Sequence, residues 1–243
     1  MKILVLTSSY PKYPGDTTAP FIQSITHALA ARGHELTVVL PDRADLNPAP
    51  APGVSFEAYR YAPTESLEVF GYAEALRADV AVRRSTYLVS PLALASGATK
   101  MMFEVRRGGY DLVHAHWVVP NGAMALPAAW LGGLPLVVSL HGSDVFLSEK
   151  KFLFRQAARL AFRRAAAATA CSDDLAERSQ RLGAPSRPQT IPYGVDTEHF
   201  LGSSEDSVKL RKRLGLGGDQ PQVEPFQQLP RVGEFQALGL ERG

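Results

Sequence analysis

The chain has 243 residues, of which 45% are hydrophobic, so it is long enough to bury one large core or two smaller ones. Its 26 basic and 24 acidic side chains nearly balance, which argues against a dedicated nucleic-acid binder. The single cysteine, Cys171, excludes an intrachain disulfide and favours a reducing compartment, so we expect a cytoplasmic protein.

The beginning of the chain predicts a strand, a loop, a helix and a second strand, which together form one βαβ unit. The strands are Lys2–Thr7 and Glu35–Leu40, and the polar loop is Ser8–Thr18. The helix is expected to use Thr17 or Thr18 as its N-cap, to carry Pro20 in its first turn and to end at Gly33.

The next part predicts one more strand and a long helical region. Val54–Tyr61 alternates like a strand. Thr64–Arg107 is mostly helical in pattern, with breaks expected near Ser90-Pro91 and at Gly97.

The most informative stretch runs from Asp111 to Asp144. A short apolar strand ends in His114, His116 and Trp117, and Asn121 opens a helical segment that Gly132-Gly133 closes. Leu134–Leu140 has no polar alternation, as expected for a strand covered on both faces, and His141-Gly142-Ser143-Asp144 follows it. Val118–Leu140 has no charge and could span a bilayer by length, but its prolines and glycines divide it into helix, turn and strand.

The remaining elements continue the alternation of helices and strands. Ser148–Arg164 predicts an amphipathic helix with Ser148 as its cap, and Ala165–Ser172 a weak strand. Further helices are expected at Asp173–Leu182, closed by Gly183, and at Ser203–Leu214. The fold class predicted is therefore α/β, with a doubly wound parallel Rossmann-like sheet.

One helix carries a basic stripe opposite its apolar face. An ordinary solvated face explains it, and so does attraction to anionic lipid headgroups that would hold the protein peripherally at a membrane. The basic residues are Lys150, Lys151, Arg155, Arg159, Arg163 and Arg164.

His116 and His141 follow neighbouring strands and should meet at one edge of the sheet, where ligands of open α/β sheets bind. Such histidines serve either as structural residues or as groups that bind a ligand hydroxyl or orient a reaction centre. Asp144 is a candidate carboxylate, whereas Asp111 precedes its strand and is interpreted as a turn residue. The His114-x-His116 pair lacks further ligands at a familiar spacing, so we expect no metal.

The Ser8–Thr18 loop meets the start of a helix, whose N–H groups and dipole favour an anion such as phosphate. Gly15 would permit close backbone approach, and Asp16 would accept from a hydroxyl or cap the helix.

Four segments in order give a resemblance to a known family. They are KILVLTSSYPKYPGD followed by APFIQSITHALAARGHELTVVLP, then DLVHAHWVVPNGAMA, then LVVSLHGSDVF, then CSDDLAERSQRLGAP followed by IPYGVDTEHF. From Met1 to about Leu216 the chain resembles the N-terminal half of the family 4 retaining glycosyltransferases, which have the two-Rossmann-domain GT-B architecture.

The resemblance implies a hexosyl transfer from a nucleotide sugar to a glycan or lipid-linked acceptor in polysaccharide or glycolipid biosynthesis, with no cofactor or metal. His141 would be the catalytic residue beside the transferred sugar, and His116 and Asn121 would line the acceptor side. The remaining substrate-binding residues it implies are Tyr10, Gly15 and Asp16 on the first loop and Gly142, Ser143 and Asp144 after the later strand. Pro192–Asp196 would mark the domain junction, where Tyr193 replaces the asparagine more common in relatives.

The chain departs from the family after Leu216, where the basic pair, the Glu-x7-Glu motif and the nucleotide pocket of the second domain are not found. We expect a Rossmann-like domain at 1–200, a linker helix at 201–216 and an aberrant, unstructured tail at 217–243, as a frame change or incomplete reading frame would produce. This half alone is expected to be weakly active or inactive. A sugar- or phosphate-binding module without chemistry, or another GT-B enzyme such as a sugar-nucleotide epimerase, are the alternatives. The sequence does not identify a partner chain.

Overall fold

The computed structural model describes residues 1–64, 67, 68, 70–72, 76, 77, 81, 82, 84–184, 186–194, 204–213 and 215. The chain divides into two units, Met1–Gly194 and Val195–Gly243, which are described separately. In the second unit, α8 (Ser204–Arg213) lies within the predicted helix. The predicted domain boundary at residue 200 and the predicted tail at 217–243 lie outside the described residues.

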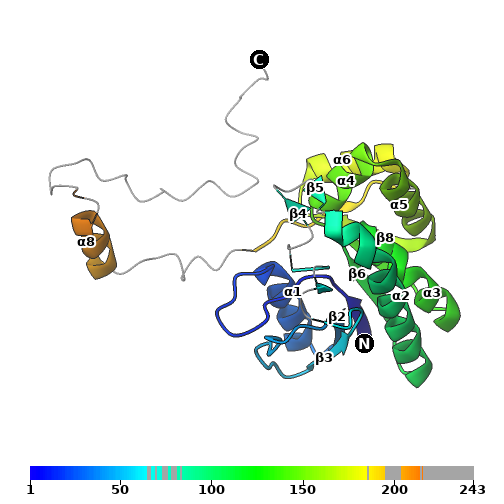
Figure 1. Ribbon diagram of the computed structural model, residues 1–243, viewed down its shortest axis with the longest axis horizontal. Helices are drawn as coiled ribbons and strands as arrows, with labels where there is room; N and C mark the ends of the chain where they lie inside the picture. The colour runs from blue at the N-terminus through cyan, green and yellow to red at the C-terminus, as the bar shows by residue number, and fades with distance from the viewer. Residues whose placement is uncertain are drawn as a thin grey trace, which may run out of the picture. The chain divides into compact units, whose positions relative to one another are not determined.

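The first unit is built on one seven-stranded sheet in the order β3-β2-β1-β6-β7-β8-β9 (Figure 1). Every pairing in this sheet is parallel, which confirms the predicted doubly wound α/β class. Its strands are β1 (Lys2–Leu6), β2 (Glu35–Pro41), β3 (Val54–Tyr59), β6 (Leu112–His116), β7 (Leu136–Leu140), β8 (Ala165–Ala170) and β9 (Gln189–Thr190).

Helices cover both faces of this sheet, so its strands need no polar side. In β1, Ile3 and Val5 join a core with Ile22 of α1, whereas Leu4 and Leu6 join a second core with the other helices of this unit. Helices α2 and α3 pack side by side in that second layer (Figure 1). The helices are α1 (Pro20–Ala31), α2 (Arg84–Arg107), α3 (Ala123–Gly132), α4 (Ser143–Lys150), α5 (Phe152–Arg164) and α6 (Asp173–Leu182), with a π-helical turn η2 (Val118–Gly122) before α3.

The strand order reverses between β1 and β6, because the chain continues from β1 to β2 on one side and reaches β6 on the other. Leu6 aligns with Ala115, and His116 aligns with Ser139 of β7. The loops after β1, β6 and β7 therefore leave the sheet at one edge and at the position where open α/β sheets bind ligands.

The predicted N-cap of α1 is wrong. Ala19 caps the helix in the left-handed region (φ 48°) without a side-chain hydrogen bond, and Pro20 begins the helix as expected. The Thr18 amide and hydroxyl both donate to Asp16 Oδ1, at 3.0 and 2.8 Å. Because the carboxylate of Asp16 holds Thr18 within the loop, the helix starts later than the sequence suggests.

The single helix predicted at Ser148–Arg164 is two helices, α4 and α5, which meet at the extended residue Lys151. Ser148 is not a cap. It is fully buried within α4, and its hydroxyl donates to the carbonyl of Asp144 at 2.7 Å. Here a serine hydroxyl bonds back along its own helix, an alternative that sequence alone does not separate from a cap.

The breaks predicted at Pro91 and Gly97 are also wrong, because α2 continues from Arg84 to Arg107 with Pro91 inside it. A Cβ at Gly97 would lie 2.6 Å from Met124 Sδ and 3.1 Å from the Tyr59 ring. This glycine therefore allows α2 to approach its neighbours closely and does not end the helix. Before α2, β4 (Leu76–Arg77) and β5 (Ala81–Val82) form a short antiparallel pair where helix was expected.

Candidate functional site

Three histidines lie together at the carboxyl edge of the sheet. The rings of His114 and His116 on β6 are 4.3 Å apart, and those of His116 and His141 are stacked at 5.2 Å. His116 Nδ1 lies 3.0 Å from His141 Nε2, a hydrogen bond in which one ring must donate. The structure thus brings together the two histidines predicted to line the site.

Burial keeps these imidazoles neutral near pH 7. Burial lowers the pKa of His114 to about 4. The pKa of His141 is lowered to about 3, mainly by burial and in smaller part by the nearby His114. The pKa of His116 is also lowered, mainly by burial and then by His114 and His141. The cluster therefore offers neutral donors and acceptors to a ligand and supplies no positive charge.

Asp144 organises the loop that presents His141. Its carboxylate accepts from the backbone N–H groups of Val118 at 2.8 Å, Gly142 at 3.0 Å and His141 at 3.2 Å. Burial raises the pKa of Asp144 to about 6, although these N–H bonds act in the opposite direction. Asp144 is 1% exposed, so its place in the structure is to join the β6 and β7 loops, and its predicted contact with substrate stays a prediction.

Gly142 and Ser143 form the start of α4 beside this carboxylate. Gly142 has φ +112°, a conformation that side chains rarely adopt, so the turn between His141 and α4 requires glycine. Ser143 is the first residue of α4. Both residues directly follow His141, and their predicted contact with substrate stays a prediction.

Asn121 does not start a helix as predicted but lies in η2, fully buried. Its Nδ2 donates to the carbonyl of His116 at 2.7 Å and to Ser8 Oγ at 3.3 Å. Asn121 therefore connects the loop after β1 to the loop after β6, across the point where strand order reverses. Its Oδ1 and His116 Nε2 are buried without a hydrogen-bond partner among the described residues, and a bound ligand would offset that cost.

The Ser8–Thr18 loop is held by its own side chains. Besides Thr18, the carboxylate of Asp16 accepts from the Lys12 amide at 2.8 Å, and Gly15 is exposed with φ +89°. Tyr10 is fully buried, and its hydroxyl lies 3.1 Å from Thr26 Oγ. Tyr10 thus supports the loop from the core, while Gly15 is the predicted site residue on this loop that is open to solvent.

Aromatic residues surround His141, and sequence reasoning assigned none of them to the site. Phe21, at the start of α1, lies 5.0 Å from the His141 ring and stacks on Tyr193 at 4.6 Å. Trp117 lies 4.5 Å from His141, and the Tyr193 hydroxyl is in hydrogen-bond contact with His141 Nδ1. Phe21 was interpreted only as core, although its place one residue after Pro20 puts it where the helix meets the sheet edge.

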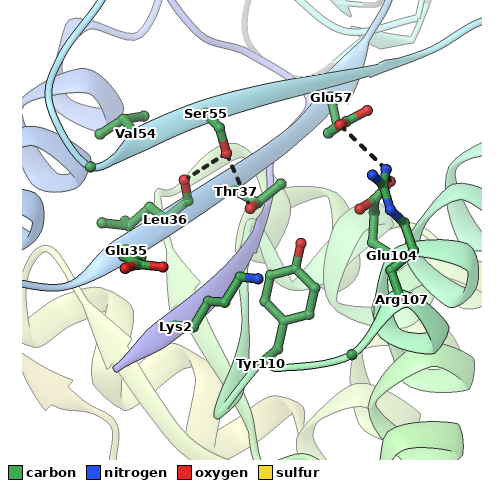
Figure 2. Close-up of a pocket in the computed structure, with 12 residues that line it drawn as sticks. Lys2, Glu35, Leu36, Thr37, Val54, Ser55, Glu57, Glu104, Arg107 and Tyr110 are labelled. Carbon is green, nitrogen blue, oxygen red and sulfur yellow. Dashed lines mark hydrogen bonds and ion pairs between the residues drawn. The ribbon is translucent and has the colours of Figure 1, made fainter.

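A separate polar pocket of about 650 Å³ lies at the opposite edge, where β1, β2 and β3 begin. Figure 2 shows Tyr110 pointing into it, with Lys2 5.0 Å from the Tyr110 ring centre and an ion pair between Arg107 and Glu57 at its side. No residue predicted for the site lines this pocket. Within the described ranges, the chain has no group of three side chains suited to a metal and no helix long and apolar enough to span a membrane.

Comparison with known proteins gives the same family as the sequence motifs. The family model described as Glycosyltransferase Family 4 matches residues 19–199. TuaC of Bacillus subtilis (strain 168), named as a teichuronic acid biosynthesis glycosyltransferase, is 27% identical over 90% of this chain and 56% of its own length. The N-acetyl-alpha-D-glucosaminyl L-malate synthase of Bacillus anthracis is 22% identical over 96% of this chain and 56% of its own.

Solved structures share the fold. Anabaena Alr3699/HepE in complex with UDP-glucose superposes with a TM-score of 0.56 and 21% identity, over 88% of this chain and 50% of that one. A sucrose-phosphate synthase fragment from Thermosynechococcus elongatus gives a TM-score of 0.51 and 14% identity, over 88% and 99% of the two chains. The chain spans about half the length of the curated relatives it matches. It belongs to glycosyltransferase family 4.

Proposed function

We propose that this chain is the acceptor-binding half of a retaining glycosyltransferase that transfers a hexosyl group from a nucleotide sugar to a glycan or lipid-linked acceptor. The neutral His116–His141 pair at the sheet edge carries this proposal. A sugar hydroxyl needs polar atoms fixed in position, and next to this pair His116 Nε2 and Asn121 Oδ1 are buried without a hydrogen-bond partner among the described residues.

The nature of the donor follows from the family and from a structural relative. Alr3699/HepE has been solved with UDP-glucose, which supports a nucleotide sugar as donor for the complete enzyme. The described histidine cluster is uncharged, so charge on the leaving diphosphate would be stabilised elsewhere, by the second domain that family members carry. We propose no metal cofactor, and we place the reaction in the cytoplasm at the inner face of a membrane.

Replacing His141 by alanine is expected to reduce sugar transfer about 100-fold, the usual effect of removing one fixed hydrogen-bond donor from a transferase-type site. The coding DNA would be read beyond Leu216 in all three frames, and an enzyme extended by a second domain would be assayed with nucleotide sugars. His34→Ala is the matched control, because the His34 ring contacts the amino group of Met1 and is not part of the histidine cluster.

Two results would contradict the proposal in different ways. Unchanged turnover in the His141→Ala enzyme would remove His141 from the site. Robust transfer by the 243-residue chain alone would show that it is not a half-enzyme.

A further inference from the structure

An exposed apolar surface lies on α3 and α5, and none of its residues belongs to the histidine cluster. Trp130 is 80% exposed, and on α5 Leu153 is 78%, Phe152 68% and Leu160 53% exposed. Water-soluble proteins rarely expose several large apolar side chains next to one another, and such a patch usually marks a binding surface. We call Trp130, Phe152, Leu153 and Leu160 the α3–α5 face.

The α5 residues occupy one side of their helix. Leu153 and Leu160 are two turns apart, while Ala158, Ala161 and Phe162 of the same helix are fully buried against the core. Trp130 and Leu160 line a common groove of about 560 Å³ together with Leu126, Pro127, Leu134 and Arg164. The face is therefore continuous from one helix to the other.

The unpaired charges described beside this face are positive. Arg163 and Arg164 are exposed on α5, and Lys150 and Lys151 are exposed where α4 meets α5. Among the described residues none of these four side chains has an ion pair or hydrogen bond. Neither α3 nor α5 contains an acidic residue, and the nearby Glu149 is paired with Arg178 at 2.8 Å.

We propose that the α3–α5 face docks on a lipid bilayer that contains anionic phospholipids. Exposed tryptophan, phenylalanine and leucine next to unpaired lysine and arginine is the composition of a surface that lies in the headgroup layer. The apolar side chains enter the boundary with the acyl chains, and the four cations attract the anionic headgroups. This inference rests on the proposed function in one respect, the location at a membrane, and it names the surface that makes the contact.

The charge complementarity favours lipid over a protein partner. A protein interface of this size would place acidic or neutral polar groups among its basic rim to give specificity, whereas four unpaired cations around tryptophan and leucine need only a diffuse negative surface. A second copy of the chain would bring four further cations against the first four, which is unfavourable.

The test is co-sedimentation of the purified chain with vesicles of phosphatidylcholine alone and of phosphatidylcholine with an equal amount of phosphatidylglycerol. We expect at least about tenfold tighter binding to the anionic vesicles at low salt. Arg163→Glu with Arg164→Glu should reduce that binding at least about tenfold. The control, Arg32→Glu with Arg60→Glu, makes the same change of net charge at the C-cap of α1 and after β3 and should bind like the unmodified chain.

Fluorescence identifies the face directly, because the chain has two tryptophans, Trp117 and Trp130. In a Trp117→Phe variant, Trp130 emission should shift to shorter wavelength on anionic vesicles and be quenched by lipids brominated on their acyl chains. In a Trp130→Phe variant, Trp117 should show neither change.

Equal binding of the charge-reversed and unmodified chains, or no binding to either vesicle, would overturn the proposal. A dimer in light scattering that the Arg163→Glu and Arg164→Glu changes convert to monomer would also overturn it, because the face would then be a subunit interface. Circular dichroism establishes that each variant is folded. The vesicle experiment measures lipid binding and not sugar transfer. The lipid-docking proposal can therefore fail while the sugar-transfer proposal stands, and the sugar-transfer proposal can fail while lipid docking stands.

Discussion

Acidification from pH 7 to pH 5 is expected to lower the free energy of unfolding by about 4 kcal/mol, a large part of the stability of an ordinary domain. The cause is burial of His114, His116 and His141, whose pKa values are all lowered in the folded chain. Below their usual pKa near 6.5 the unfolded chain takes up three protons that the folded chain does not.

The sign for each group follows from the direction of its shift. The three histidines contribute stability that is present above about pH 6.5 and lost as the pH falls toward about 4, each by roughly 2 kcal/mol between pH 7 and 5. Asp144, with its pKa raised to about 6, acts the other way and stabilises the folded chain by roughly 1 kcal/mol over the same interval. Three histidines outweigh one carboxylate, so the net effect is destabilisation in acid.

Urea unfolding at a series of pH values measures this effect. His114→Gln should reduce the loss by about half, because Gln keeps a polar partner for Ser139 but does not titrate. His34→Gln is the control for removing a histidine outside the buried cluster. Stability that is flat between pH 7 and 5 would show that the three imidazoles are accessible to protons in the folded chain.

Replacing Asp144 by alanine is expected to destabilise the chain by about 3 kcal/mol. Two buried N–H groups, on Val118 and Gly142, and the part-buried N–H of His141 lose their acceptor, which costs roughly 3 to 9 kcal/mol in all. Removing a buried carboxylate returns about 3 kcal/mol at neutral pH, the equivalent of raising its pKa from 3.8 to about 6. The middle of the first range, about 6 kcal/mol, exceeds this return and leaves a loss of about 3 kcal/mol.

Asp111→Ala is the matched control for this variant. Asp111 accepts one backbone N–H, that of Lys2 at 2.7 Å, at an exposed position, so its loss should cost about 1 kcal/mol or less. Chemical denaturation of both variants at pH 7 gives the two free energies. A loss below 1 kcal/mol for Asp144→Ala would mean that water replaces the carboxylate and that Asp144 does not hold the β6 and β7 loops together.

The alternation of apolar strands and helices was enough to predict the parallel sheet, because strands covered on both faces show no polar positions. Chain order also placed His116 and His141 at one edge, since parallel strands end on the same side. The wrong predictions concern residues that can interact either with their own segment or with a distant part of the chain. Ser148 bonds within its helix, Gly97 serves helix packing, and Asp16 holds Thr18 in the loop.

The aromatic surroundings of His141 depend on contacts between distant segments, which no local pattern reports. Tyr193 reaches His141 from 52 residues further along the chain, and Asn121 reaches Ser8 across 113 residues. The resemblance to glycosyltransferases named segments that the structure brings together, but it did not name these contacts. The position of Tyr10 shows the same limit, because a loop tyrosine predicted to face substrate packs against Thr26 and Phe56 in the core.

The most direct test of the site is nuclear magnetic resonance of the chain labelled uniformly with nitrogen-15 and titrated with a short glycan acceptor. We expect saturable shifts of the His116 and His141 ring nitrogens, with His34 unchanged as the internal control. Unmoved His116 and His141 signals, with changes confined to backbone amides around Lys2 and Tyr110, would place the ligand in the opposite pocket and contradict the sugar site at the His116–His141 pair.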